Sequence, residues 1–240
     1  MDLRELGSGV NPADHWYYIS KSKLLGRYAS RRFRRVVDVG SGSGFFSSVV
    51  QKLCTPDEII QVDPNFEVES VSVIGTTTLR RLCETPTSLV DADLVLLMDV
   101  LEHVQDPEGL LRSYIDRSGI NCEFLITVPA FNFMWSDHDV FLGHYKRYRR
   151  QELDEMVTGC GLEILSSGYF FSFVFPIAIF QRKILGNFKR SSSRGTALRK
   201  SSLVVHRLLS FVCLIEYLIW RGCSKIPGLT VVVFAKKTRP

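Results

Sequence analysis

The sequence predicts an α/β fold in which a mostly parallel, seven-stranded sheet carries helices on both faces. Two observations predict it. Short, continuously apolar runs alternate with stretches of helical periodicity, which is typical of parallel strands buried on both sides. The 240 residues are 45% apolar and 23% charged, a composition typical of a folded globular protein. This length suits one large α/β unit, so we expect residues 1–240 to form a single domain.

The expected elements alternate along the chain. Helical patterns occupy residues 11–33, Phe45–Leu53, Pro107–Ile115 and 151–160. The seven expected strands are Val36–Val39, Glu58–Val62, Val71–Ile74, Asp93–Asp99, Glu123–Val128, Leu162–Ser166 and Thr230–Ala235. Ligands of such sheets lie beyond the carboxyl ends of the strands, so the residues that follow each strand are the first candidates for a site.

A glycine-rich turn follows the first of these strands. Residues 36–44 read Val-Val-Asp-Val-Gly-Ser-Gly-Ser-Gly and lead directly into a helical stretch. Glycine lets the backbone turn tightly and approach a ligand, and a helix that begins there offers unpaired N–H groups. Asp63, nineteen residues after Gly44, ends the next strand, where a carboxylate can accept both hydroxyls of a ribose. This combination predicts a site for a nucleotide-like ligand.

The spacing of the glycines narrows the class of ligand. A dinucleotide fingerprint has G-x-G-x-x-G, whereas this turn has G-x-G-x-G, and the chain has no G-x-x-x-x-G-K-[ST] phosphate loop. Residues 36–44 instead resemble the first motif of class I S-adenosylmethionine (SAM)-dependent methyltransferases. The resemblance implies a Rossmann-like fold, SAM as the cofactor and Asp63 on its ribose. The turn residues that it places at the cofactor are Asp38, Gly40, Ser41, Gly42 and Gly44.

A second segment resembles the same family. Residues 93–104 are similar to the fourth strand and following turn of the subgroup that methylates small molecules, lipids and sugars. This resemblance implies that Asp99, Glu102 and His103 lie near the sulfonium and the acceptor, with Asp99 among the cofactor contacts. Members of the family carry an acidic residue for the adenine amine before this strand. The corresponding position falls around Arg81 or Leu82, neither of which can accept a hydrogen bond from that amine, and Glu84 is the expected substitute.

Two more segments resemble members that accompany bacterial surface-glycan synthesis. His15-Trp16-Tyr17-Tyr18 is similar to their aromatic N-terminal helix, with Lys21 or Lys23 in place of the usual arginine and Tyr18 as a candidate cofactor contact. His138-Asp139 together with residues 143–148 is similar to their His-Asp…Gly-His-x-Arg-Tyr loop.

The histidines are the candidate general bases, because a hydroxyl acceptor must lose its proton during methyl transfer. The candidates are His144, His138 and His103, and His144 is favoured because it lies in a loop expected over the site, with a carboxylate nearby. Asp139, Arg147 and Tyr148 are the candidate acceptor contacts, since arginine binds phosphate and carboxylate through forked hydrogen bonds. A surface ion-pair network explains these arginines equally well.

Residues 169–226 form an expected hydrophobic and basic helical insertion before the last strand. Its aromatic segment is too short to span a bilayer, and its later apolar segment carries His206, Arg207 and Glu216, which argues against a lipid-crossing helix. Two apolar helices with a cationic connection favour an anchor lying in the plane of a membrane. A helical cap on the sheet or a dimer contact is the alternative.

Charge and cysteine usage complete the expectations. The net charge of +5 is concentrated in basic clusters at residues 27–35, 146–150 and 183–207, which suit an anionic partner or solvated helix faces. Six scattered cysteines show no metal-ligand spacing, so we expect a reducing compartment and no structural metal. A polar N-terminus without signal-peptide character favours the cytoplasm and the inner face of a membrane.

These patterns leave three other functions open. The chain can be a SAM-binding regulatory subunit that methylates nothing, a nucleic-acid methyltransferase, or an NAD-linked oxidoreductase. The sequence shows no Asn/Asp-Pro-Pro-Tyr motif after the fourth strand, so a nucleic-acid substrate is not the expected one. A small-molecule, glycan or lipid-linked acceptor is preferred.

Overall fold

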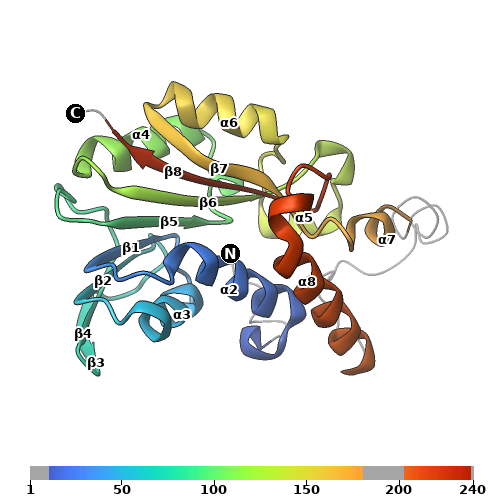
Figure 1. The fold of residues 1–240 in the computed structure, drawn as a ribbon. Helices are drawn as coiled ribbons and strands as arrows, with labels where there is room; N and C mark the ends of the chain where they lie inside the picture. The colour runs from blue at the N-terminus through green and yellow to red at the C-terminus, as the bar shows by residue number, and fades with distance from the viewer. Residues whose placement is uncertain (1–10, 181–202, 239–240) are drawn as a thin grey trace.

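The computed structural model describes residues 11–180 and 203–238, which contain an eight-stranded sheet with helices on both faces (Figure 1). The strand order is β3-β4-β2-β1-β5-β6-β8-β7, with β3 and β8 antiparallel to their neighbours. The strands are β1 (Arg35–Val39), β2 (Glu58–Val62), β3 (Ser70–Ile74), β4 (Thr77–Leu82), β5 (Leu94–Met98), β6 (Glu123–Pro129), β7 (Leu162–Phe170) and β8 (Thr230–Lys237). The predicted Rossmann-like α/β fold is confirmed.

The helices alternate with the strands as the apolar pattern predicts. The α-helices are α2 (Trp16–Ala29), α3 (Phe45–Cys54), α4 (Pro107–Arg117), α5 (Asp137–Leu142), α6 (Arg150–Gly159), α7 (Phe175–Phe180) and α8 (Leu203–Cys223). Three short 3-10 turns are η1 (Pro12–Asp14), η2 (Leu101–His103) and η3 (Asn132–Met134). Local sequence sets the starts: Asp106 caps α4 by accepting the N–H of Gly109 at 2.9 Å, with Pro107 in the first turn.

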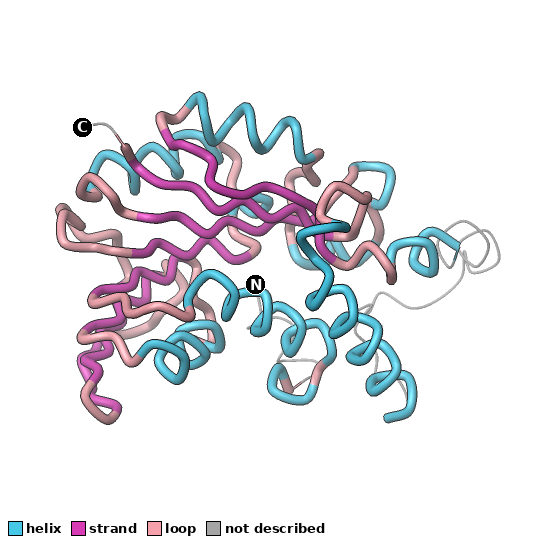
Figure 2. Tube along the Cα trace, viewed as in Figure 1, coloured by secondary structure: helices cyan, strands magenta, loops and turns pink. Residues whose placement is uncertain are grey.

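The sheet buries apolar side chains on both faces, because successive residues of its central strands point to opposite sides. Val37 and Leu97 belong to the cluster under α4 and α6, whereas Val36 and Leu96 belong to the cluster under α2, α3 and α8. Figure 2 shows the strands as a layer between these two groups of helices. Continuous apolar runs are therefore needed in β1 and β5, and polar residues gather where the strands end.

All seven expected strands are present, and six of them lie within two residues of their expected bounds. The eighth strand, β4, escapes prediction because its sequence is dominated by threonine and arginine instead of apolar residues. It pairs in parallel with β2 and forms a hairpin with β3, through a turn in which Gly75 has a φ angle of +64°. Polar character is tolerated here because β3 and β4 lie at the edge of the sheet.

The seventh strand is longer than expected. It runs to Phe170, because Tyr169 and Phe170 pair with Val231 and Thr230 of β8. The aromatic run assigned to the insertion thus begins inside the sheet. Of the insertion itself the structure describes α7 and α8, and residues 181–202, which carry most of the third basic cluster, lie outside the described residues.

One side of α8 packs on the molecule and the other is exposed. Cys213 is buried against α2, and the buried carboxylate of Glu216 accepts the backbone N–H groups of Ser172 and Phe173 at 2.7 and 3.2 Å. The guanidinium of Arg27, on α2, lies 4.7 Å from the ring of Tyr217. None of the described helices combines the length and the apolar character that crossing a membrane requires.

The path from α8 into β8 yields a test of this packing. A Cβ on Gly228 would lie 2.4 Å from the carbonyl oxygen of Phe170. Backbone atoms cannot swing aside as a side chain can, so we expect Gly228→Ala to lower the free energy of unfolding by about 1–3 kcal/mol in denaturant titrations. Gly159→Ala is the control, since nothing lies within 4 Å of its added Cβ. In that variant the free energy of unfolding should rise by about 0.4–1 kcal/mol. Equal denaturation midpoints for the two variants would contradict the close packing of Gly228 against Phe170.

Candidate active site

The turn after β1 has the backbone that its glycines predict. Gly40, Gly42 and Gly44 have φ angles of +60°, +53° and +78°, which residues with a Cβ rarely adopt. A Cβ on Gly40 would lie only 3.0 Å from Cγ2 of Val100, at the end of the neighbouring strand. The N–H of Gly40 donates to the carbonyl oxygen of Val62 at 2.7 Å. The turn is therefore pinned to the end of β2 with its backbone open to a ligand.

Two carboxylates support this turn from different sides. Asp63, directly after β2, accepts the N–H of Gly42 at 2.8 Å and two hydrogen bonds from Asn65, and is 3% exposed. Asp38, inside β1, accepts the hydroxyl of Ser47 at 2.5 Å and so joins the strand to α3. Asp63 lines a cavity and Asp38 does not, among the residues described. Asp38 therefore helps to position the turn, and its role as a direct cofactor contact stays a prediction.

A cavity of about 940 Å³ extends from the glycine turn to the segment after α5. Its lining includes Gly40, Asp63 and Glu84, which follow β1, β2 and β4, and Asp99 and His103, which follow β5. Strand ends thus converge on one cavity, as parallel sheets dictate. Its volume suits a ligand of cofactor size.

Glu84 is the expected substitute for the acidic residue that the family carries for the adenine amine. It lies two residues beyond β4 and lines the cavity. Arg81, which the residue count had placed at the adenine, instead has its guanidinium 4.4 Å from the ring of Phe66.

Asp99 is a buried carboxylate with a complete set of partners. It has a φ angle of +58°, a left-handed conformation that aspartate tolerates better than most residues. Its oxygens accept hydrogen bonds from the Lys21 ammonium, from the Tyr17 hydroxyl at 3.0 Å and from the Thr127 hydroxyl at 3.2 Å. The side chain of Lys21 has no exposed surface, so this ion pair is fully buried. The aromatic N-terminal helix thus reaches Asp99, which lines the cavity, through Tyr17 and Lys21.

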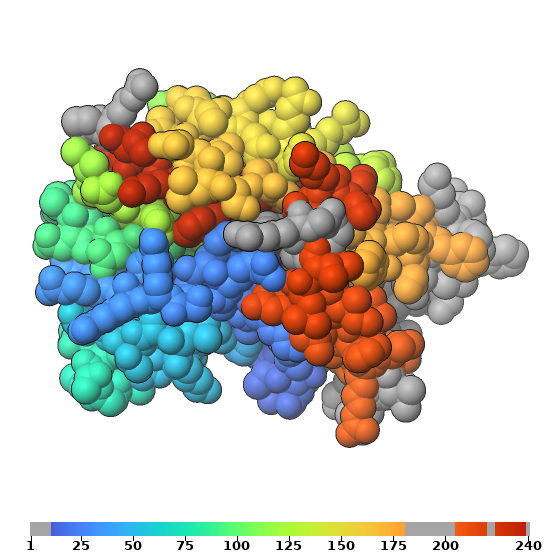
Figure 3. Space-filling view, viewed as in Figure 1, coloured from blue at the N-terminus to red at the C-terminus, as the bar shows by residue number. Residues whose placement is uncertain are grey.

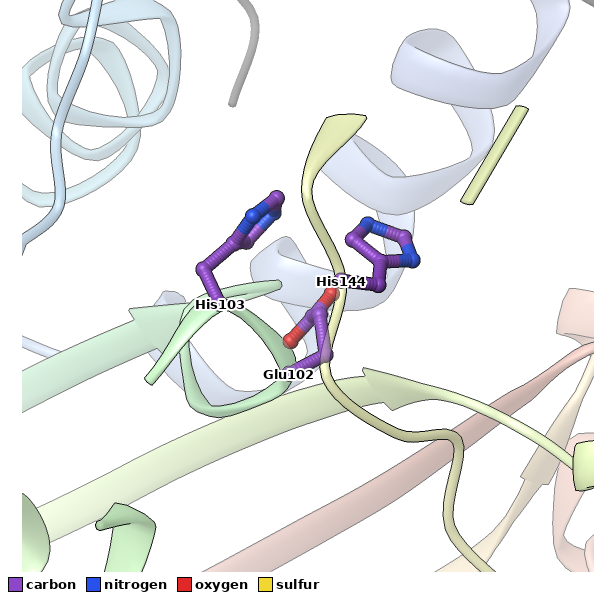
Figure 4. Close-up of side chains that lie close together, drawn as sticks. All are labelled: Glu102, His103 and His144. Carbon is purple, nitrogen blue, oxygen red and sulfur yellow. The ribbon is translucent and has the colours of Figure 1, made fainter. Parts of the chain in front are cut away.

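Glu102 is a second buried carboxylate only three residues away, and it lacks such partners. The residue has no exposed surface, and neither of its oxygens accepts a hydrogen bond from another described residue. Burial raises its pKa well above the usual range, and the nearby Asp99 carboxylate adds to the effect. Figure 4 shows Glu102 beside His103 and His144, and one ligand-type atom from each of the three lies within 4.8 Å of the others.

The loop after α5 holds His144 in place. Nδ1 of His144 lies 2.8 Å from Oδ1 of Asp139, and both oxygens of Asp139 also accept from the Arg147 guanidinium, at 2.7 and 3.0 Å. Burial alone would raise the pKa of Asp139, but these hydrogen bonds outweigh it and hold the pKa below its usual range. An ionised carboxylate only accepts, so Nδ1 of His144 carries the proton and Nε2 keeps its lone pair when the ring is neutral.

The three residues of this loop that were predicted to bind the acceptor are buried. Asp139, Arg147 and Tyr148 are 0%, 6% and 1% exposed, and the Tyr148 hydroxyl donates to the carbonyl oxygen of Leu101 at 3.1 Å. An arginine and a tyrosine in a basic loop look exposed in a sequence, yet here their polar groups are used inside the protein. They hold the loop against η2, and none of the three lines the cavity within the described chain.

Other predicted residues, Gly42 and Gly44 among them, also lie outside the cavity lining, as far as the described chain shows. Tyr18 is 1% exposed, with its ring against Phe45 and Phe46, Ser41 is buried in the glycine turn, and His138 lies on α5 outside the cluster of Glu102. Of the predicted bases, His103 lines the cavity, and the His144 ring packs behind it with centroids 4.5 Å apart.

Sequence reasoning missed two residues of this site. Asn65 hydrogen-bonds the carboxylate of Asp63, and its signal was the Asp-Pro-Asn turn after the second strand. Tyr145 lines the cavity, and its N–H donates to the carbonyl oxygen of Glu102 at 2.7 Å. Tyr145 belongs to the loop of residues 143–148 that resembles the family motif, but it occupies the variable position of that motif.

The fold and the cavity define a class I SAM-dependent methyltransferase. Residues 14–167 match the methyltransferase domain family, and the chain belongs to that family. Its cofactor is SAM. No curated protein sequence matches the chain.

Solved structures share the fold at low sequence identity. A SAM-dependent methyltransferase from Archaeoglobus fulgidus is 16% identical, with a TM-score of 0.54, covering 92% of this chain and 94% of that one. A complex of the Haloferax volcanii Trm112 activator with a methyltransferase matches at 13% identity and a TM-score of 0.54, covering 89% and 88%. Phosphoethanolamine N-methyltransferase 2 from Haemonchus contortus matches at 14% and 0.53, covering 90% of this chain and 52% of that one.

Because the ion pair of Arg147 with Asp139 is buried, replacing Arg147 should affect the stability of the protein. Removing one partner of a buried pair leaves the other charge uncompensated, so we expect Arg147→Ala to lower the free energy of unfolding by about 3–5 kcal/mol. Arg32→Ala is the control, since its pair with Asp57 is exposed on both sides and should change stability by about 1 kcal/mol or less. Chemical denaturation measures both. An Arg147→Ala protein that unfolds like the wild type but loses acceptor affinity would support the substrate-binding assignment.

Proposed function

We propose that this chain transfers the methyl group of SAM to a hydroxyl or carboxyl group of a small-molecule, glycan or lipid-linked acceptor, with residues 1–240 acting as one methyltransferase domain. The observation that carries the proposal is the continuous cavity. It joins Gly40 and Asp63, which suit the cofactor, to Asp99 and His103, beyond β5.

The residues present fit SAM. Gly40 lines the cavity, Asp63 stands at a strand end where a carboxylate can accept ribose hydroxyls, and Glu84 can accept from an adenine amine. When bound, SAM supplies a methyl group already activated by its sulfonium. The protein's task is then to align the acceptor in line with the methyl group and to exclude water. Lys21 neutralises Asp99, so the wall beyond β5 is rigid and carries little net charge.

We assign the acceptor to the end of the cavity that His103 lines. His103 lines the cavity, whereas the side chain of His144 is only 4% exposed and lies behind it. An acceptor hydroxyl therefore meets His103 first, and the preference for His144 as the direct base is revised. A carboxyl acceptor is already ionised and needs only alignment at the same place.

We further propose that the enzyme works against an anionic membrane surface. Leu208, Phe211 and Leu218 are 60%, 59% and 68% exposed and recur along one side of α8, away from α2. Figure 3 shows α8 on the surface beside the N-terminal helix. Residues 181–202, which precede α8, contain seven arginines and lysines and no acidic residue. An exposed apolar helix face next to a cationic segment suits anionic lipid, which would also bring a lipid-linked acceptor to the enzyme.

One observation weakens the nucleic-acid alternative. In the first basic cluster Arg31 pairs with Glu123, and Arg35 with Glu58 at 2.5 Å. These charges are balanced within the protein and leave less cationic surface for phosphates. The alternative of a regulatory subunit predicts the same SAM site, so it must be distinguished by assay. Such a protein binds SAM but forms no methylated product.

The cofactor carboxylate gives the first functional test. We expect Asp63→Ala to weaken SAM binding, measured by calorimetry, by at least about tenfold, since a charged hydrogen bond contributes about 1.5–3 kcal/mol. Labelled methyl transfer from SAM into fractionated lipids, glycans and nucleic acids should fall in parallel. Asp116→Ala, on the exposed side of α4, is the control and should bind SAM as the wild type does. Tight SAM binding with no labelled product in any fraction would favour the regulatory subunit, and label only in RNA or DNA the nucleic-acid enzyme.

The α8 surface gives a second test. We expect the full chain to sediment with vesicles rich in phosphatidylglycerol, and the double variant Leu208→Glu/Phe211→Glu to remain in the supernatant, because buried carboxylates oppose insertion. Val71→Glu/Val73→Glu is the matched control, since these side chains are 66% and 69% exposed at the β3 edge. If both double variants sediment like the wild type, or if the wild type never sediments at low salt, the membrane proposal fails.

A further inference from the structure

The cluster of Glu102, His103 and His144 has the composition of a metal-binding site. A carboxylate oxygen and two imidazole nitrogens lie within 4.8 Å of one another (Figure 4). In a metal site each ligand atom lies about 2.1 Å from the ion. The three atoms would reach that distance if each moved inward by less than about 1 Å. Two histidines and one carboxylate form a common ligand set for first-row divalent ions at sites that keep open positions for substrate.

The partners of Glu102 point to a missing positive charge. Asp99, three residues earlier, has an ammonium group and two hydroxyls bound to its oxygens. Glu102 is equally buried, yet neither of its oxygens accepts a hydrogen bond from another described residue. A buried carboxylate is costly unless it is paired, and metal coordination is one of the ways in which proteins pair it. Lys21 forms its ion pair with Asp99, so its charge acts on Glu102 only from a distance, and no salt bridge joins Glu102 to a cation among the described residues.

His144 is held in the state that metal ligation requires. Asp139 binds Nδ1, which fixes the tautomer and leaves the lone pair on Nε2. That Nε2 is buried and has no hydrogen-bond partner among the described residues. Carboxylate, imidazole and metal in this order form a recurrent arrangement, in which the carboxylate orients the ring and raises its basicity. Arg147 in turn holds Asp139 through two hydrogen bonds.

The two segments that supply the cluster are fastened together. The N–H of Tyr145 donates to the carbonyl oxygen of Glu102 at 2.7 Å, and the Tyr148 hydroxyl donates to that of Leu101 at 3.1 Å. These bonds fix His144 relative to η2, which carries the other two residues. A site whose ligands are oriented before the ion arrives is the kind that binds with useful affinity.

We propose that Glu102, His103 and His144 bind one first-row divalent cation of the Mn²⁺ to Zn²⁺ series, and that this ion holds the acceptor oxygen during methyl transfer. Only the role of the ion in methyl transfer rests on the proposed function; metal binding by the three residues does not. Because His103 also lines the cavity, the ion would face the acceptor. A bound divalent ion lowers the pKa of an oxygen ligand. The hydroxyl proton then leaves to solvent, the O–C bond forms, the C–S bond breaks, and its electron pair stays on sulfur. The ion thus takes the role first given to a histidine base.

The test is metal binding by the full chain, independent of turnover. Chelator-treated protein is titrated with Zn²⁺ and, separately, Mn²⁺ by calorimetry, and bound metal is counted by elemental analysis. We expect one ion per chain and a rise in Tm on adding Zn²⁺. Glu102→Gln and His144→Ala should each weaken binding by at least a hundredfold and abolish the rise in Tm. Glu102→Gln keeps the side-chain volume, so its fold should survive, and unchanged SAM binding verifies this.

His138→Ala is the matched control, because His138 lies in the same loop region outside the cluster and should leave one ion per chain. No stoichiometric ion in the wild type, or binding that survives both Glu102→Gln and His144→Ala, as cysteine ligation of Zn²⁺ would, overturns the site. If methyl transfer proceeds at the full rate in the presence of chelator, the ion has no role in the reaction, but the proposed function still holds. A bound ion without methyl transfer to any fraction leaves the site standing and removes the proposed function.

Discussion

Burial of the sheet on both faces is the constraint on which the rest of this structure depends. With Val36 and Val37 facing opposite apolar clusters, the central strands are apolar at most positions along their length, and buried polar residues such as Asp38 are exceptions. Polar chemistry can gather only where strands end, and parallel strands end together. The glycine turn, Asp63 and Asp99 come from three different strand ends, yet they share one cavity. The location of the site is thus a consequence of how the core is built.

Two buried carboxylates beyond the end of β5, Asp99 and Glu102, differ in the partners that the protein gives them. Asp99 is satisfied by Lys21, which reaches it from the N-terminal helix. Glu102 is as deeply buried, but its neighbours are two imidazole rings instead of an ammonium group. Proteins seldom bury a carboxylate without a counter-charge or hydrogen bonds. The contrast separates a carboxylate that stabilises the fold from one that is prepared for a ligand.

The parts of the site that are local in sequence were predictable. The glycine turn and Asp63 follow from short motifs with a defined strand and helix context, and six strands from continuous apolar runs. Burial of loop side chains was not predictable: Arg147 looks like a surface group until its pair with Asp139 is seen. The cluster of Glu102 with His144 joins residues 42 positions apart. No spacing rule in the sequence reveals it. β4 was not predicted because it lies next to the edge strand β3, where half-buried threonine and arginine are tolerated.

The N-terminal helix α2 touches two distant parts of the molecule at once. Lys21 and Tyr17 project from it to Asp99, while Arg27 and its apolar side contact α8. Neither α8 nor α2 supplies a residue to the described lining of the cavity, yet α8 braces the helix that holds Asp99, which does line it. Deleting α8 would be expected to loosen the pocket from behind, so a truncated enzyme is a poor stand-in for the intact one.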